Sequence, residues 1–379
     1  MLSLAVVAWQ FDRIQGEVLA LVGAPPTPTL TPATLARRGY DAYLNGDLER
    51  AALDLGQAVR QMPNNVDYLY EYGRILVLLN RGEEGLAAAD QAIAAAPNDP
   101  RGYALKVFAL DTLGRAEEAI PVGLAALELD PTFAPTYAYL SGAYISSGRW
   151  SQGQQMAERA VELDPASVDA RRAYAFSLTY TGQYEAAAQQ LEAAVALHPA
   201  LDFLYFELAM DYRALNNEPA AIAAYERVLA MDPTNVKALV RLCDTYYNLR
   251  QDNYAQDYCE QALDIDPNYA EAWMRVGTVY YVRRNYESAI DAFERCVELG
   301  SEEIQCWYLR GLAHYYLDEC DQAVPILQEA YTRTTSDQIL GIIREGLRLC
   351  AFVDPAYDDS IIPTPAPTPT ELPTPIGIF

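Results

Sequence analysis

The chain has 379 residues, of which 51% are apolar and 21% charged, and its formal charge is −25 at pH 7. Its length alone would allow two or three globular domains. The acidity and the lack of a basic stripe argue against a nucleic-acid partner, because phosphates would be repelled. Helix-forming residues dominate positions 35–350, which indicates an all-α protein.

Residues 1–31 form an apolar stretch that ends in a Pro/Thr-rich linker. The segment "LSLAVVAW" (2–9) is too short to span a bilayer, and it lacks the basic flank and cleavage site of a signal peptide. Two interpretations remain open for this region. It is either a poorly ordered or interfacial leader or the trailing end of a membrane anchor that would tether the protein.

A period of 34 residues runs through the centre of the chain, and a proline marks it. With this proline as position 32 of the unit, nine units cover residues 32–337. The seven prolines at this interval are Pro63, Pro97, Pro131, Pro165, Pro199, Pro233 and Pro267.

Two positions of the unit hold small residues throughout. Small side chains at a fixed phase indicate two helices that cross closely, since larger ones would hold the backbones apart. Position 20 reads Ala51, Gly85, Ala119, Gly153, Ala187, Ala221, Ala255, Ala289 and Ala323. Position 27 reads Ala58, Ala92, Ala126, Ala160, Ala194, Val228, Ala262, Cys296 and Ala330.

Each unit is predicted to be a helix–turn–helix. Positions 4, 7, 8 and 11 give the first helix one apolar face. In four units a glycine at position 15 ends this helix, and the proline at position 32 ends the second one. In the connector "DPNYAEAW" we expect Asn268 to cap the next helix and Glu271 to complete a capping box.

The repeated unit resembles the tetratricopeptide (TPR) family. Residues 273–280, "WMRVGTVY", followed by Ala289 and Phe293, fit the family pattern W-x2-L-G-x2-Y, A and F. Val276 replaces the usual Leu, and Ser301 stands where Pro is usual. The resemblance implies a right-handed α-solenoid of nine TPR repeats over 32–337. We expect a capping helix at 338–352 and a disordered Pro/Thr-rich tail at 353–379.

No residue pattern indicates catalysis. His198 and His314 have no metal or triad partner at a meaningful spacing, and no phosphate-binding loop or zinc-protease motif is present. We therefore expect no enzyme activity, no cofactor and no metal.

The family resemblance places positions 2, 5, 9, 12 and 13 of the first helix on the concave face. The aromatic and Arg content of these positions favours a groove that binds a protein or peptide, although single tyrosines can instead be packing residues. Cations in an otherwise acidic protein favour an acidic-aromatic segment as the ligand. The predicted groove residues are Tyr40, Tyr43, Tyr70, Arg74, Arg101, Phe108, Arg172, Phe176, Tyr180, Phe206, Met210, Arg213, Lys237, Tyr247, Met274, Tyr281, Tyr308, Tyr315 and Tyr316.

All six cysteines fall between residues 243 and 350, at positions that antiparallel neighbouring helices bring together across a turn. Disulfides would imply an oxidising compartment, whereas the alternative is that cysteine serves as a small apolar packing residue. The expected pairs are Cys243 with Cys259, Cys296 with Cys306, and Cys320 with Cys350.

The sequence therefore predicts a non-enzymatic protein–protein interaction scaffold. We expect it to be extracellular or in the cell envelope, either exported or tethered to the surface. The alternatives are a cytosolic TPR adaptor with free thiols and a structural spacer.

Overall fold

The computed structural model describes residues 30–354 and 356–363, and these residues form helices and turns without any strand. The described part divides into two compact units at Leu215 and Asn216. This boundary lies in the turn between the two helices of the sixth repeat. The predicted leader and the predicted tail beyond residue 363 lie outside the described residues.

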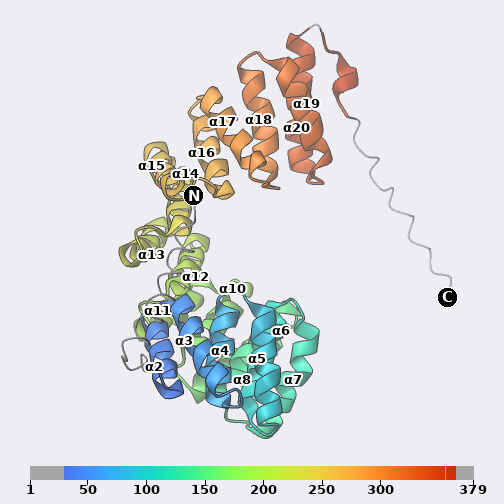
Figure 1. Cartoon of the computed structure of the whole chain (residues 1–379). Coiled ribbons are helices and arrows are strands. Elements are labelled where there is room, and N and C mark those ends of the chain that lie inside the picture. The colour runs from blue at the N-terminus through green and yellow to red at the C-terminus, as the bar shows by residue number, and fades with distance from the viewer. Residues whose placement is uncertain (1–29, 355, 364–379) are drawn as a thin grey trace, which may run out of the picture. The chain divides into compact units, whose positions relative to one another are not determined.

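The first unit contains the helices of repeats 1–5 and the first helix of repeat 6 (Figure 1). Each helix packs against the next one along the chain, and the first helices of repeats 2–5 also contact one another in succession. The helices are α2 (Pro32–Leu44), α3 (Leu48–Gln61), α4 (Val66–Leu78), α5 (Gly82–Ala95), α6 (Pro100–Thr112), α7 (Ala116–Leu129), α8 (Ala134–Ser146), α9 (Trp150–Leu163), α10 (Val168–Tyr180), α11 (Tyr184–Leu197) and α12 (Asp202–Ala214).

The second unit contains the remaining repeats and the C-terminal helix. Its elements are α13 (Glu218–Met231), α14 (Val236–Asn248), α15 (Asp252–Ile265), α16 (Ala270–Val282), α17 (Tyr286–Glu298), α18 (Ile304–Tyr316), α19 (Cys320–Thr332), α20 (Asp337–Val353) and a short 3₁₀ helix, η1 (Asp359–Ile361). The predicted all-α architecture of 34-residue helix–turn–helix repeats is confirmed.

The small residues at positions 20 and 27 lie where neighbouring helices approach closely. Every Ala, Val and Cys at these positions is fully buried. A Cβ built on Gly85 would lie 2.6 Å from a methyl group of Val77, and one built on Gly153 would lie 2.6 Å from Cγ1 of Ile145. The helices therefore approach too closely for a larger side chain.

Position 15 adopts the left-handed conformation in every repeat. At Gly148, for example, φ is 77°; its N–H donates to Ile145 O, and the N–H of Arg149 donates to Tyr144 O. This hydrogen-bond pattern ends the helix. Glycine was expected here in only four repeats, yet the other five residues adopt the same conformation. They are Asn80, Asn216, Arg250, Arg284 and Asp318.

The connector proline has a second role in five repeats, where its carbonyl oxygen accepts a hydrogen bond from the side chain at position 4. In repeat 8 the indole N–H of Trp273 donates to Pro267 O at 2.8 Å. Repeat 9 has Ser301 in place of proline, and there Trp307 Nε1 is buried without a partner among the described residues. The other four donors are Tyr103, Tyr137, Arg171 and Tyr205.

Two local predictions need correction. Asn268 does not cap α16: Tyr269 is the N-cap residue and makes no side-chain cap hydrogen bond, whereas Glu271 pairs with Arg241. The predicted disordered tail also begins too early. Tyr357, Ile361 and Ile362 pack against the core of the second unit, because their apolar side chains are placed there by the turn that follows α20.

Candidate functional site

A pocket opens on the surface formed by the first helices of the first unit, and this surface is called the inner surface. The pocket has a volume of about 240 Å³ and is lined by side chains of α6, α8, α10 and α12, so four successive repeats contribute to it. The lining residues are Phe108, Asp111, Thr112, Ala138, Tyr139, Gly142, Asp169, Arg172, Ala173, Phe176 and Glu207.

Gly142 makes room for the pocket. It occupies position 9 of repeat 4, where the repeats on either side carry Phe108 and Phe176. A Cβ on Gly142 would lie 2.6 Å from Oδ2 of Asp111, so the missing side chain lets this carboxylate approach the helix. The ring of Phe108 stacks on that of Tyr139, with centroids 4.5 Å apart and planes inclined by 3°. The pocket thus combines aromatic faces with a carboxylate.

Asp111 is the carboxylate of this pocket for which the described residues provide no cation. Its Oδ1 is buried and has no hydrogen-bond partner among them. Burial raises the pKa of Asp111, and a hydrogen bond with the Ser146 side chain only partly opposes this effect. A buried carboxylate oxygen without a donor is costly, so a ligand that supplies a donor would gain binding energy here.

The other two carboxylates of the pocket are paired. Arg172 Nε donates to both carboxylate oxygens of Glu207, at 2.8 and 3.0 Å. Burial lowers the pKa of Arg172, but the charge of Glu207 and its hydrogen bonds raise it overall. Asp169 Oδ2 accepts a hydrogen bond from the Tyr139 hydroxyl at 2.8 Å and lies 3.7 Å from Arg74 Nη1. The unpaired negative charge therefore belongs to Asp111.

Three large apolar side chains are exposed on α10 and α12. Phe176 and Tyr180 lie on α10 with ring centroids 4.7 Å apart, and 40% and 55% of their surfaces are exposed. Met210 on α12 is 61% exposed. Phe176 also lines the pocket, so apolar surface continues from the pocket onto the inner face.

Four predicted groove residues of the first unit are buried instead of open to a ligand. Arg74 Nη1 donates to the Tyr43 hydroxyl, and the Tyr43 ring lies 5.4 Å from that of His198. Repeats 1 and 2 therefore contact repeat 5, and α2 lies beside the end of α11 (Figure 1). These contacts bury Tyr43 and Arg74 between repeats. The four buried residues are Tyr43, Tyr70, Arg74 and Phe206.

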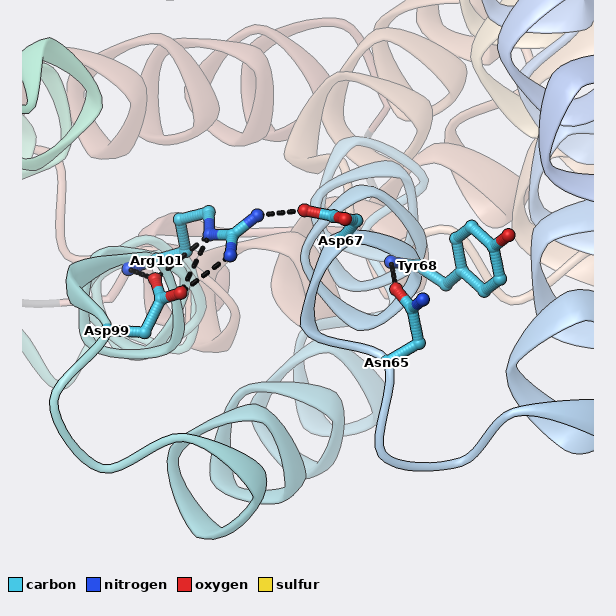
Figure 2. Close-up of polar contacts among 5 residues, drawn as sticks. All are labelled: Asn65, Asp67, Tyr68, Asp99 and Arg101. Carbon is cyan, nitrogen blue, oxygen red and sulfur yellow. Dashed lines mark hydrogen bonds and ion pairs between the residues drawn. The ribbon is translucent and has the colours of Figure 1, made fainter. Parts of the chain in front are cut away.

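Arg101 was predicted to offer a free cation to a ligand, but it already has two partners (Figure 2). Its Nε and Nη2 donate to the carboxylate of Asp99, the N-cap residue of α6, at 2.9 and 2.6 Å. Its Nη1 contacts Asp67 of α4, which follows the N-cap residue Asn65. These ion pairs join repeats 2 and 3.

The predicted groove residues of the second unit lie on α14, α16 and α18. The Tyr316 ring contacts those of Tyr281 and Tyr286, at centroid distances of 6.0 and 4.8 Å. Met274 is buried, Lys237 and Tyr316 are exposed, and the other four tyrosines are half-buried. In the first unit Tyr40 is exposed and Arg213 is half-buried. The four half-buried tyrosines of the second unit are Tyr247, Tyr281, Tyr308 and Tyr315.

The six cysteines form three pairs, all within the second unit, and the pairs are those expected from the sequence. One pair joins the two helices of repeat 7, with 5.4 Å between its Cα atoms. The other two join helices on either side of a connector, at 6.2 and 5.6 Å. The pairs are Cys243–Cys259, Cys296–Cys306 and Cys320–Cys350.

The two histidines lie on different helices, His198 at the end of α11 and His314 on α18. Burial lowers the pKa of His198 at the end of α11, whereas His314 Nδ1 lies 2.7 Å from a Glu319 carboxylate oxygen. Within residues 30–354 and 356–363, no group of three or more potential ligands is arranged to hold a metal ion. None of the helices in the same residues is long and apolar enough to cross a membrane.

Four residues that shape the pocket were not predicted from the sequence: Asp111, Tyr139, Gly142 and Asp169. Gly142 left a readable signal, since position 9 carries a side chain in every other repeat. Asp111 and Asp169 also occupy concave positions, 12 and 2, but the expected groove comprises only aromatic, thioether and cationic side chains.

The fold defines a repeat α-solenoid, and the comparisons with known proteins agree. Tetratricopeptide-repeat models match residues 42–107, 143–202 and 177–235, and a model described as anaphase-promoting complex, cyclosome, subunit 3 matches residues 250–330. The chain belongs to the tetratricopeptide repeat family, and it is accordingly a protein–protein interaction scaffold.

Two solved structures share the fold at low sequence identity. The APC/C hetero-tetramer Cut9–Hcn1 matches with a TM-score of 0.58 and 18% identity, over 79% of this chain and 59% of that one. This chain therefore spans less than two thirds of that relative. The human IFIT1 dimer with PPP-AAAA matches with a TM-score of 0.53 and 15% identity, over 85% and 77% of the two chains. No curated protein sequence matches the chain.

Proposed function

We propose that the inner surface of the first unit binds a segment of a partner protein. The observation that carries this proposal is the pocket around Gly142, which opens beside the exposed side chains of Phe176, Tyr180 and Met210. Exposed aromatic and thioether groups next to a pocket offer large contact area at low entropic cost, as binding hot spots do. A segment lying across α10 and α12 would bury them.

An acidic partner segment was expected because the groove was expected to contain free cations. Three of these cations are not free. Arg74, Arg101 and Arg172 each pair with carboxylates of their own chain. An acidic segment would have to compete with these intramolecular partners. The apolar part of the expectation, contact with aromatic and thioether groups, remains in the proposal.

We also propose that the protein acts in an oxidising compartment, either exported or held at a cell surface. The support is the set of three cysteine pairs in the second unit, because disulfides persist outside reducing compartments. The predicted tether belongs to residues 1–29, which lie outside the described residues.

A matched pair of photo-crosslinking positions tests the binding surface. Tyr180 and Trp150 are aromatic residues of the same unit with 55% and 53% of their surfaces exposed, but Tyr180 is on a first helix and Trp150 on a second helix. A photoreactive phenylalanine at Tyr180 should crosslink to a discrete partner in the native host. Capture at Trp150 but not at Tyr180 would contradict the proposal.

A further inference from the structure

The pocket around Gly142 has a chemical character that narrows its ligand, given the proposed function of the inner surface. Its volume of about 240 Å³ is below the roughly 300–1,000 Å³ of pockets for drug-sized ligands. It therefore suits a single side chain of a partner segment better than a whole cofactor.

The charges of the pocket favour a cation. Three carboxylates and one guanidinium line it, and that guanidinium, from Arg172, is held by Glu207. Asp169 is engaged by Tyr139 and Arg74. Asp111 is left with a buried oxygen that has no donor among the described residues. An acidic or neutral occupant would leave this carboxylate unpaired, which is costly at low dielectric.

The aromatic lining favours the same ligand class. Phe108 and Tyr139 form a stacked pair, and Phe176 lies at the matching position of the next repeat. The face of an aromatic ring attracts an ammonium or guanidinium group, and the attraction increases when the cation is desolvated. A carboxylate beside aromatic faces provides both a charge-assisted hydrogen bond and cation–π contact.

We propose that this pocket accepts one basic side chain, a lysine or an arginine, from a partner protein segment bound across α8 and α10. Asp111 pairs with the cationic group, and Phe108 and Phe176 flank its aliphatic part. The absence of a side chain at Gly142 provides the space. The basic side chain is assigned to a separate chain because the residues outside the described ranges contain few basic groups. Residues 364–379 contain no Lys or Arg, and residues 1–29 contain only Arg13.

Methyl NMR on the full chain tests this proposal, because Ala138 and Ala173 line the pocket and report on its occupancy. The probes are acetylated, amidated Gly-Ser-Arg-Ser-Gly and its counterparts with lysine, citrulline, norleucine or glutamate at the centre. The arginine or lysine peptide should shift both methyl signals saturably. Its affinity should exceed that of the citrulline and norleucine peptides at least tenfold, or about 1.4 kcal/mol.

Three variants localise the effect. Asp111→Asn should weaken binding of the basic peptide at least tenfold, and Gly142→Leu should abolish it by filling the pocket. Glu128→Gln removes the same charge from an exposed site on α7 and should change nothing. Thermal melts and helical spectra show whether each variant remains folded. If Gly142→Leu fails to fold, Asp111→Asn alone decides.

Several results would overturn the inference. Equal affinity for the arginine and citrulline peptides, unchanged affinity in Asp111→Asn, or no shift with any peptide would each do so. The Ala138 and Ala173 methyl signals of the parent chain and of Arg13→Gln should coincide when no peptide is present. If they differ, the chain's own leader is the occupant. Crosslinking at Tyr180 tests the proposed function independently. If a partner is captured there but the pocket does not prefer basic peptides, only the proposal of a basic side chain is rejected.

Discussion

Arg74 Nη1 lies 3.7 Å from Asp169 Oδ2, which joins repeats 2 and 5 of the first unit. Arg74 is only 7% exposed, and it also pairs with Glu71 and donates to the Tyr43 hydroxyl. Two carboxylates and a phenol thus share one buried guanidinium. This contact buries Arg74 between the first helices of repeats 2 and 5.

Replacing Arg74 by Met should destabilise the first unit by about 2–4 kcal/mol, because it leaves Asp169 and Glu71 without their shared cation. Hydrogen exchange should accelerate in α2, α4 and α10 and stay unchanged in α17 and α18. The double variant Arg74→Met/Asp169→Asn should recover part of the loss. Unaltered exchange in α2 and α4 would mean that the contact does not hold the repeats together.

Replacing Ala187 or Ala289 by Leu should destabilise the corresponding unit by about 1–3 kcal/mol, since both alanines are fully buried at helix crossings. Ala196→Leu, at an exposed position of α11, is the matched control and should have little effect. A thermal melt that does not distinguish Ala187→Leu from Ala196→Leu would reject the close crossing.

Asp211 should make the first unit less stable as the pH rises from about 4 to 6. It is 2% exposed, its Oδ1 accepts a hydrogen bond from Thr179, and its Oδ2 has no partner among the described residues. Burial raises its pKa from 3.8 to about 6, so the folded state retains a proton that the unfolded chain releases. The group therefore stabilises below pH 4, and this contribution is lost through pH 6.

Asp211→Asn removes this dependence. The free energy of unfolding of the variant should exceed that of the parent by an amount that grows between pH 4 and 6. Above pH 6 the difference should level off at about 1–3 kcal/mol. Urea titrations across this range measure it, with the exposed Glu128→Gln as control. A difference that is constant with pH would show that Asp211 has an ordinary pKa.

The six cysteines should be oxidised in protein isolated from its native compartment. Under denaturing, non-reducing conditions no cysteine should react with an alkylating reagent. Each disulfide closes a short loop, so reduction should cost the second unit about 2–4 kcal/mol per bond and leave the melting of the first unit unchanged. Six reactive thiols in the native protein would instead favour a cytosolic adaptor.

Much of the fold was predictable because the repeat fixes it locally. The 34-residue proline period gave the helix boundaries, and the small residues at positions 20 and 27 gave the crossing points. The expected cysteine pairs followed from the antiparallel geometry of adjacent helices. Each of these features depends on neighbours within one or two helices, and such neighbours can be inferred from the spacing along the chain.

The binding surface was harder to predict because it depends on contacts between distant repeats. Tyr43, Tyr70 and Arg74 occupy the concave positions of ordinary groove residues, and only contacts beyond their own repeats show that they are buried. The pairing of Arg172 with Glu207 likewise joins two repeats. The pocket itself was readable at Gly142, where the side chain at position 9 is missing.

The most direct test of binding on the inner surface is the affinity of the partner captured at Tyr180 for the parent chain and for Gly142→Leu, with Ala196→Leu as control. The added side chain would fill the pocket beside Phe108 and Phe176. If the inner surface of the first unit binds the partner, Gly142→Leu should weaken binding at least tenfold, and Ala196→Leu should leave it unchanged. Equal affinity for all three folded proteins would contradict binding at this surface.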